Sequence, residues 1–530
     1  MKLRYYIMPL FCCSVFSLTA IAQLSEHTID AEQMPNEPTV AIANDSVLYA
    51  AANVHNFYSI QQRVDGYKST YEMNVNKQLA KSAYGVYGDP VLHYAADTLF
   101  FAHLAKAEGK VYGDWFDRIV LQKITNPTTW QEKSYSVGYN EGKMQDKPWL
   151  SATSEGDVLV TWTEFDAYGS DAPEDRSRIR FAKYESDKNA VSNAITISDT
   201  TGDCLDGDNT LEGATTAVGR GQKIFAVWSG YSNIYFDYSN DGGATWHIDR
   251  VIARQYEGWD MAMPNIMRAN GMPFIVADTT RGRLFVTWAD ERNGNADVWA
   301  ISSDDEGATW SKPLQLNLDK TTTHQYFPNI GLDAKTGAAY VAYYDFKSSP
   351  SNTFYSISLA KIDTQLRVQN YQITPYVNSL PGNSIFFGDY LDIDIRDSLL
   401  AVVYTTYDLN QRTKVKVVQE HTLQDGIFFG IAVSNTLAIL RNKETTELMI
   451  NIEHPYKLRY TLKWLKEDTG EVFKYRSRQK DKQEKRGVDE VLATLDFGTG
   501  DRLLEFKYRF KDLETNGKYR RTIHYSADSK

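Results

Sequence analysis

The stretch MPFIVADTTRGRLFVTWAD, from Met272 to Asp290, decides the fold. Apolar and polar residues alternate on both sides of its Thr-Arg-Gly turn, which indicates two β-strands joined by a hairpin. Copies of this pattern begin at Glu37, Asp89, Lys147, Glu212, Met272, Phe327 and Gly388. The seven copies follow one another at steps that run from 52 residues (90−38) to 65 residues (213−148).

Each copy leaves room for two more strands after its hairpin, as in SRIRFAKYES from Ser177 to Ser186. Four antiparallel strands repeated at this interval are typical of a β-propeller blade. A closed ring lets each blade cover the next and leaves few open edges. We therefore predict an all-β protein with a β-propeller over residues 23–424. Seven blades are expected, and six are the alternative if one copy is a partial blade or closes the ring.

The first 22 residues have the pattern of a signal peptide. Lys2 and Arg4 precede an apolar run, and Ala20-Ile21-Ala22 is a small-x-small cleavage site. A transmembrane anchor is the alternative, but the run is short and no second one follows, so we expect no transmembrane segment in the mature chain. The prediction is an exported protein that is periplasmic, cell-surface or secreted. Only Cys204 of the three cysteines then remains, so no internal disulfide is expected.

Residues 425–530 differ from the rest in charge. They contain 21 Lys and Arg against 17 Asp and Glu, a net of +4, whereas the whole chain carries −11 and the remainder therefore −15. Strand-like alternation persists. We predict a separate, small β-sandwich-like C-terminal domain, with sorting and docking as alternative roles.

Two octapeptides share the skeleton Ser-x-Asp-x-Gly-x-x-Trp: SNDGGATW (Ser239–Trp246) and SDDEGATW (Ser303–Trp310). The Asp can accept hydrogen bonds from backbone N–H groups, the Gly can take a positive φ, and the Trp can bury a large ring. The predicted turn residues are Ser239, Asp241, Gly243 and Trp246 in the first copy, and Ser303, Asp305, Gly307 and Trp310 in the second. We predict a structural turn between the third and fourth strands of a blade.

These octapeptides match the Asp-box, through which the sequence resembles the BNR-repeat, sialidase-like propeller superfamily. The stretches YGVYGDP, QDKPW, RIRFAKY, LEGA, TTTHQYFPNI and FFGDY resemble exported members of Bacteroidetes type, from Glu37 to about Gln419. The resemblance implies that the Asp-boxes are structural and lie away from the active face. It also implies an arginine triad, a Tyr–Glu nucleophile and an acid/base Asp, but the Arg-Ile-Pro motif of the first arginine is absent. The triad is therefore not carried over, and sialic acid is not the predicted substrate.

Acidic residues stand just before the first strand in five of the repeats. They are Glu37, Asp89, Asp146, Glu212 and Asp389. Loops that enter the innermost strands of a propeller meet at one mouth of its channel. Paired carboxyl groups there can act as acid and base in glycoside hydrolysis, so Asp146, Glu212 and Asp389 are the catalytic candidates. The alternative is that these acids cap strands and tie neighbouring blades together.

Other polar and aromatic residues are predicted at the same mouth and are candidates for substrate binding. They are Asp89, Trp149, Arg292, His324 and Tyr390. Trp149 and Tyr390 stand next to candidate acids and could form a platform for a sugar ring.

The loop GDCLDGDN, from Gly202 to Asn209, contains Asp203, Asp206 and Asp208. Clustered carboxylates suit a hard cation, so calcium is the one candidate cofactor, although the spacing is not that of an EF-hand. An ordinary polar loop is the alternative.

Two functions follow from these residues. The first is an exported, sialidase-like glycoside hydrolase acting on terminal sugars, with a glycan or glycoconjugate as partner. The second is a non-catalytic propeller that binds glycan or protein at the cell envelope. The sequence leaves open whether the protein is an enzyme. Nucleic acid is not an expected partner, because the propeller is acidic and no nucleotide-binding motif occurs.

Overall fold

The computed structural model is all-β, with no helix among the residues that it describes. Those residues are 25–30, 35–44, 47–54, 56–65, 68–72, 78–106, 116–127, 129–347, 354–374, 378–379, 386–396, 399–407, 413–421, 436–441, 446–465, 472–476, 485–495, 502–512 and 518–524. The predicted signal peptide lies outside them. Within them, no helical segment has the length and apolarity needed to cross a membrane.

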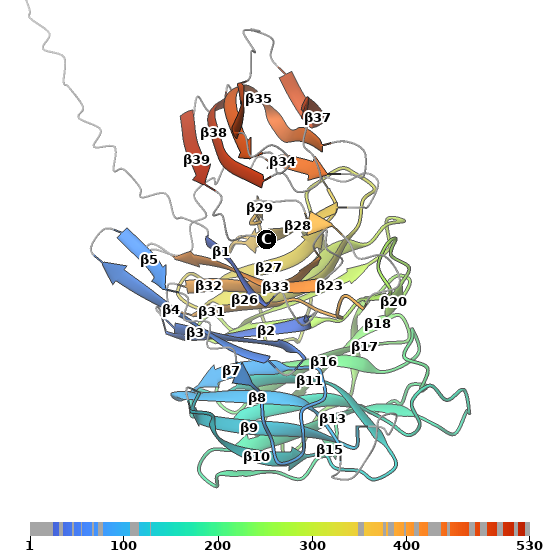
Figure 1. The fold of residues 1–530 in the computed structure, drawn as a ribbon. Coiled ribbons are helices and arrows are strands. Elements are labelled where there is room, and N and C mark those ends of the chain that lie inside the picture. The colour runs from blue at the N-terminus through green and yellow to red at the C-terminus, as the bar shows by residue number, and fades with distance from the viewer. Residues whose placement is uncertain are drawn as a thin grey trace, which may run out of the picture.

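The first four repeats each form one antiparallel sheet (Figure 1). The first contains β2 (Asn36–Asn44), β3 (Val47–Asn53), β4 (Asn56–Asp65), β5 (Lys68–Glu72) and β6 (Gln78–Leu79). The second contains β7 (Val91–Ala95), β8 (Thr98–Ala105), β9 (Arg118–Asn126) and β10 (Gln131–Val137). The third contains β11 (Met144–Ala152), β12 (Val158–Phe165), β13 (Ser177–Glu185), β14 (Ala190–Val191) and β15 (Ile195–Thr196). The fourth contains β16 (Glu212–Val218), β17 (Ile224–Gly230), β18 (Asn233–Ser239) and β19 (Arg250–Arg254).

The last three repeats complete the ring. A short pair, β20 (Asp260–Met261) and β21 (Ala269–Asn270), precedes the fifth sheet of β22 (Phe274–Asp278), β23 (Arg283–Asp290), β24 (Asp297–Ser303) and β25 (Leu314–Gln315). The sixth repeat contains β26 (Gln325–Asp333), β27 (Ala338–Asp345), β28 (Phe354–Ile362) and β29 (Val368–Gln372). The seventh contains β31 (Asp392–Arg396), β32 (Leu399–Tyr407) and β33 (Thr413–His421).

The sixth and seventh repeats share one nine-stranded sheet, because β30 (Asn378–Ser379) pairs with both β28 and β32. Counted by hydrogen-bonded sheets, the described part of the propeller therefore has six blades. Six was the alternative prediction, and it is the one confirmed. All seven repeats are present, and each supplies an inner strand to the ring.

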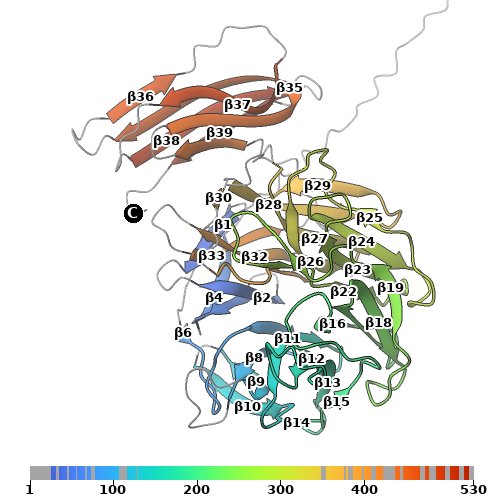
Figure 2. The ribbon, with the colours of Figure 1, turned by 90° about the vertical axis from the view of Figure 1, so that its right-hand side faces the viewer.

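The ring closes through the N-terminus of the described chain. Strand β1 (Ser25–Asp30) pairs antiparallel with β33, so the first strand completes the last sheet. Inner strand β2 contacts β7 on one side and β31 on the other. Figure 2 shows the blue and orange strands side by side at this closure.

Large apolar side chains fill the spaces between the sheets. Trp162, Trp228 and Trp288 stand at matching positions on the second strands of three successive repeats, and none of them is exposed. Burying a Trp removes 150–250 Å² from water, so these rings dominate the contacts between blades.

The two octapeptides form the same turn at the same place in successive blades, between β18 and β19 and between β24 and β25. Asp241 accepts hydrogen bonds from the Ser239 hydroxyl (2.8 Å) and from the Thr245 N–H (2.8 Å) and hydroxyl (2.6 Å). Asp305 makes the matching three bonds at 2.7, 2.8 and 2.6 Å. The expectation of a turn between the third and fourth strands is met by this geometry.

In each turn a glycine and a tryptophan pack against a phenylalanine of the preceding blade. Gly307 has a φ of +88°, and a Cβ atom on it would stand 2.4 Å from the Phe236 ring. Trp310 meets the same ring edge-on at 5.2 Å, as Trp246 meets Phe181 one blade earlier. The turn therefore ties each sheet to its neighbour.

Residues beyond the propeller form a further sheet. Its strands are β34 (Thr436–Arg441), β35 (Thr446–Leu465), β36 (Val472–Arg476), β37 (Lys485–Leu495), β38 (Arg502–Asp512) and β39 (Lys518–His524). The region is all-β, as predicted. All six strands join in one antiparallel sheet around the long β35, rather than in the two separate sheets of a sandwich.

Candidate active site

The inner strands begin with a repeated bulge. Glu37, Lys147 and Phe327 all have a φ of 47–48°, each stands before a Pro, and strand pairing shifts register there. Asp89 has the same φ before Pro90, and Gly213 holds the position in the fourth repeat with a φ of +68°. Positive φ and a bulge turn the backbone at this point, which aims the local side chains at the mouth of the channel.

The candidate acids do not occupy one repeated position. Glu37 and Asp89 are the positive-φ residues of their bulges, whereas Asp146 and Glu212 stand one residue earlier. In the third repeat Lys147 takes the place of Glu37. The sequence pattern placed all of these acids just before an inner strand and did not distinguish the two positions.

Ion pairs at the mouth centre on Asp389. Its carboxylate accepts bonds from Lys147 Nζ at 3.0 Å and from Arg268 Nε at 2.8 Å, with a second bond from Arg268 Nη2. Arg268 Nη1 also reaches Asp206 Oδ2 at 3.4 Å, and the Tyr168 hydroxyl donates to the same oxygen at 2.6 Å. We call the acids Glu37, Asp89, Asp146, Asp206, Glu212 and Asp389, with Lys147 and Arg268, the channel cluster.

Three carboxyl groups of the channel cluster, those of Glu37, Asp89 and Asp389, differ in the direction of their pKa shifts. Burial and the nearby Asp389 raise the pKa of Glu37 to about 8. Burial, followed by the charge of Glu37, raises the pKa of Asp89 well above its usual value. Burial would also raise the pKa of Asp389, but Lys147 and Arg268 outweigh it and lower that pKa. Protonated and ionised carboxyl groups therefore stand together at neutral pH.

Glu212 is the most buried member of the channel cluster. Its side chain is 0% exposed, and a hydrogen bond with Asp206 is among the causes that raise its pKa. Burial, followed by the charge of Asp206, raises its pKa well above the usual value. Burial favours the neutral form of a carboxyl group, so Glu212 holds a proton next to Asp206.

Solvent reaches the channel cluster at one edge. The Arg268 side chain is 40% exposed and that of Asp206 is 14% exposed, whereas those of Lys147 and Asp389 are 6% and 5% exposed. The Arg268 guanidinium also stacks 4.9 Å from the Phe386 ring centroid. Arg268 and Asp206 are therefore open to a ligand from solution.

Two predicted substrate-binding residues are part of the core. Trp149 and Tyr390 pack edge-on at 5.6 Å and are 9% and 6% exposed. Trp149 also packs against Phe274 at 4.9 Å, and the Tyr390 hydroxyl donates to the Pro90 carbonyl at 3.2 Å. These two rings are packed in the core and expose little surface on which a sugar ring could stack.

Two further predicted substrate-binding residues, Arg292 and His324, make contacts away from the ion pairs of the channel cluster. Arg292 Nε donates to Asp290 Oδ1 at 2.8 Å, and the guanidinium lies 4.1 Å from the Trp299 ring centroid. His324 Nδ1 accepts the Ala296 N–H at 3.2 Å, and burial lowers the pKa of the ring.

The carboxylates of the 202–209 loop diverge. Asp203 accepts the Leu205 N–H at 3.2 Å and the Thr210 hydroxyl at 2.6 Å. Asp206 binds Tyr168 and Arg268, and Asp208 accepts the Asp260 N–H at 3.0 Å. No group of three His, Cys, Asp or Glu side chains in the described part of the chain converges as metal ligands do. Calcium binding by this loop therefore stays a prediction.

Sequence reasoning missed Lys147 and Arg268 of the channel cluster, and also Tyr168, which donates a hydrogen bond to Asp206. Lys147 begins the third copy of the repeat, between Asp146 and Pro148. Its position before a Pro, which Glu37 and Asp89 share, was the feature that could have identified it. Arg268 stands between β20 and β21, and Tyr168 stands in the loop between β12 and β13, where the repeat pattern assigns no position.

No protein-family model matches the sequence, and no curated protein sequence matches it either. Similar solved structures include a protein of unknown function from Dyadobacter fermentans, with 11% identity, a TM-score of 0.39, and coverage of 76% of this chain and 99% of that one. An ulvan lyase has 10% identity, a TM-score of 0.42, and coverage of 73% and 92%. A Trypanosoma rangeli sialidase has 9% identity, a TM-score of 0.35, and coverage of 85% and 86%. At these identities and TM-scores the likenesses carry no argument about the site or the activity.

Proposed function

We propose that the protein is a glycan-active propeller that hydrolyses glycosidic bonds at the exposed edge of the channel cluster. The observation that carries the proposal is the coexistence of protonated and ionised carboxyl groups in one cluster. Glycoside hydrolysis needs one carboxyl group of each kind, and environments that push pKa values apart supply them.

Asp206 is the proposed residue that faces the sugar. It is the carboxylate at the exposed edge, and Tyr168 and Arg268 fix one of its oxygens. In this position it would activate water or stabilise the positive charge that develops on the sugar ring. Arg268 retains N–H groups that can bind a substrate oxygen.

Glu212 is the proposed proton source behind Asp206. Its raised pKa keeps a proton available at neutral pH, and Asp206 is the charge that acts on it most strongly. The Glu212 proton passes to Asp206 and from Asp206 to the leaving oxygen, and the water that then attacks the sugar returns a proton to this pair. Asp389 is proposed as a positioning residue, because both of its oxygens hold the two cations.

A hydrolysis screen tests this proposal. Purified protein is assayed against aryl glycosides and a panel of glycans that includes sialosides, together with Asp206→Asn, Glu212→Gln and the control Asp171→Asn. Asp171 is exposed in the loop after β12. We expect turnover that falls about 100-fold or more in the first two variants and is unchanged in the control. Equal turnover in all variants, with native circular dichroism, would contradict the proposal.

The second candidate function is a glycan- or protein-binding propeller at the envelope. The observation in its favour is that Glu37, Glu212 and Asp389 are only 2%, 0% and 4% exposed. Acids this buried can also act as a polar core that joins inner strands. Retention on a glycan array without turnover on any substrate would favour this candidate. The predicted export to the periplasm, cell surface or medium is part of both proposals.

A further inference from the structure

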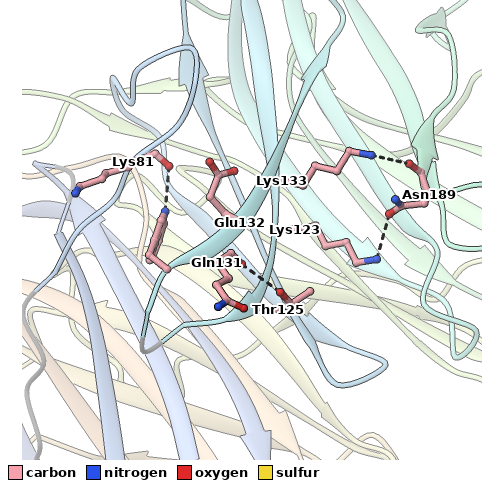
Figure 3. A pocket seen from close by; sticks show the side chains of 8 residues that line it. Lys81, Lys123, Thr125, Gln131, Glu132, Lys133 and Asn189 are labelled. Atoms are coloured by element: carbon pink, nitrogen blue, oxygen red, sulfur yellow. Dashed lines mark hydrogen bonds between the residues drawn. The ribbon is translucent and has the colours of Figure 1, made fainter.

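An open pocket of about 560 Å³ lies at the outer edge of the second repeat, away from the channel cluster (Figure 3). Lys123 and Lys133 line it from β9 and β10, Lys81 from the segment before β7, and Asn189 from the turn before β14. Strand β8 returns to the mouth and β9 runs away from it, so the β9–β10 hairpin opens at the opposite end of the blade. The pocket is therefore distinct from the proposed active site.

The three lysines give the pocket a positive charge. Within the described residues none of them forms an ion pair, although the chain as a whole carries −11. The single carboxylate of the lining, Glu132, accepts a hydrogen bond from the Ser134 hydroxyl at 2.6 Å. Figure 3 shows the ammonium groups of Lys123 and Lys133 directed to Asn189 on one side of the pocket and that of Lys81 on the other side, so an anion bound in the pocket would lie between positive charges.

Contacts with Asn189 hold two of the ammonium groups in place. Lys123 Nζ donates to Asn189 Oδ1 at 3.2 Å and to the Tyr184 hydroxyl at 2.8 Å. Lys133 Nζ donates to the Asn189 carbonyl at 3.4 Å. An ammonium group has three donors, so both lysines keep N–H groups for a ligand, and their stems are fixed before it arrives.

We propose that this pocket binds an oxyanion, sulfate or carboxylate, carried on a saccharide chain. Lysine ammonium groups act as point charges and accept such groups without a fixed bidentate geometry. Thr125 and Gln131 add neutral polar groups of the kind that contact sugar hydroxyls. The open shape leaves room for a chain to extend beyond the bound group, whereas a free ion would leave most of the volume unfilled.

Isothermal titration of the full chain tests the pocket. The probes are a sulfated chondroitin hexasaccharide, its unsulfated counterpart and inorganic sulfate. The variant is Lys81→Gln/Lys133→Gln, and the matched control is Lys312→Gln/Lys320→Gln, which removes two exposed lysines from another blade. We expect the pocket variant to lose about tenfold or more in affinity for the sulfated probe, and the control to change little.

Each outcome decides the proposal. Equal weakening in both double variants would overturn it, because the attraction would then come from total charge. Binding of inorganic sulfate as tight as that of the hexasaccharide would overturn the saccharide carrier and leave a site for a free anion. No binding of any probe by the unaltered chain would overturn the pocket itself. Hydrolysis by the channel cluster does not enter these readouts, so the two proposals fail independently.

Discussion

The pKa values of Asp241 and Asp305 in the outer turns and of Glu37 at the channel mouth are shifted in opposite directions. In the outer turns, hydrogen bonds from Thr245 and Thr309 hold the pKa of Asp241 and of Asp305 at about 2. At the channel mouth, burial raises the pKa of Glu37 to about 8. The outer turns surround a charge with N–H and O–H donors, whereas the mouth buries acids with too few cations. The difference shows that hydrogen-bond donors and solvent around a carboxyl group set its pKa. They distinguish a structural acid in a turn from a candidate catalytic acid at the mouth.

The largest expected effect comes from breaking the buried ion pairs. Asp389→Asn leaves the Lys147 ammonium, whose side chain is 6% exposed, without its carboxylate partner. Removing one member of a buried pair costs about 3–5 kcal/mol of unfolding free energy. Urea denaturation followed by tryptophan fluorescence measures it. The double variant Asp389→Asn/Lys147→Met should recover part of the loss, and no recovery would show that the pair is not the cause.

Gly307→Ala tests the outer turn at its tightest point. The new Cβ would meet Phe236 at 2.4 Å on a backbone with a φ of +88°, so we expect a loss of about 2–4 kcal/mol. Gly294→Ala is the matched control, because its φ is +87° but its Cβ would meet nothing within 4 Å. The control should cost about 1 kcal/mol, and equal losses in thermal or urea unfolding would show that packing on Phe236 does not matter.

The pH dependence of stability should separate the two regions. The pKa of Glu37 is about 8 in the folded protein against an ordinary value of 4.5, so the unfolded chain releases this proton first. The contribution of Glu37 to the free energy of unfolding is therefore fully present below about pH 4.5 and is lost as the pH rises towards 8. Glu37→Gln should therefore flatten the decline of the unfolding midpoint between these pH values. An unchanged slope would mean that Glu37 is ionised in the folded state.

Asp241→Asn should have the smallest effect. The folded pKa of Asp241 is about 2, below its ordinary value, so this carboxylate stabilises the fold above the unfolded pKa and loses that effect as the pH falls through about 2. The variant should unfold at a slightly lower temperature than the parent at neutral pH and at the same temperature near pH 2. A difference that persists in acid would point to lost turn geometry rather than lost charge.

Period-two alternation and turn residues were enough to predict the strands, the repeats and the place of the octapeptide turns. They did not show that β30 joins the sixth and seventh repeats, because two residues carry no periodicity, nor that β1 closes the ring with a partner nearly 400 residues away. Within the site, Glu37 and Glu212 were recognisable as acids near an inner strand. Arg268, on which the electrostatics depend, stands in a loop without any repeat signal, so only the folded arrangement identifies it.

Ionisation of the buried glutamates is the property on which the proposed hydrolysis depends most directly. Carbon-13 NMR of protein labelled at the glutamate Cδ, with Glu37→Gln and Glu212→Gln spectra for assignment, follows each group through a pH titration. We predict that Glu37 titrates near pH 8 and that Glu212 is still protonated at neutral pH. Midpoints of both groups near 4.5 would contradict the division of carboxyl groups on which the proposed chemistry depends.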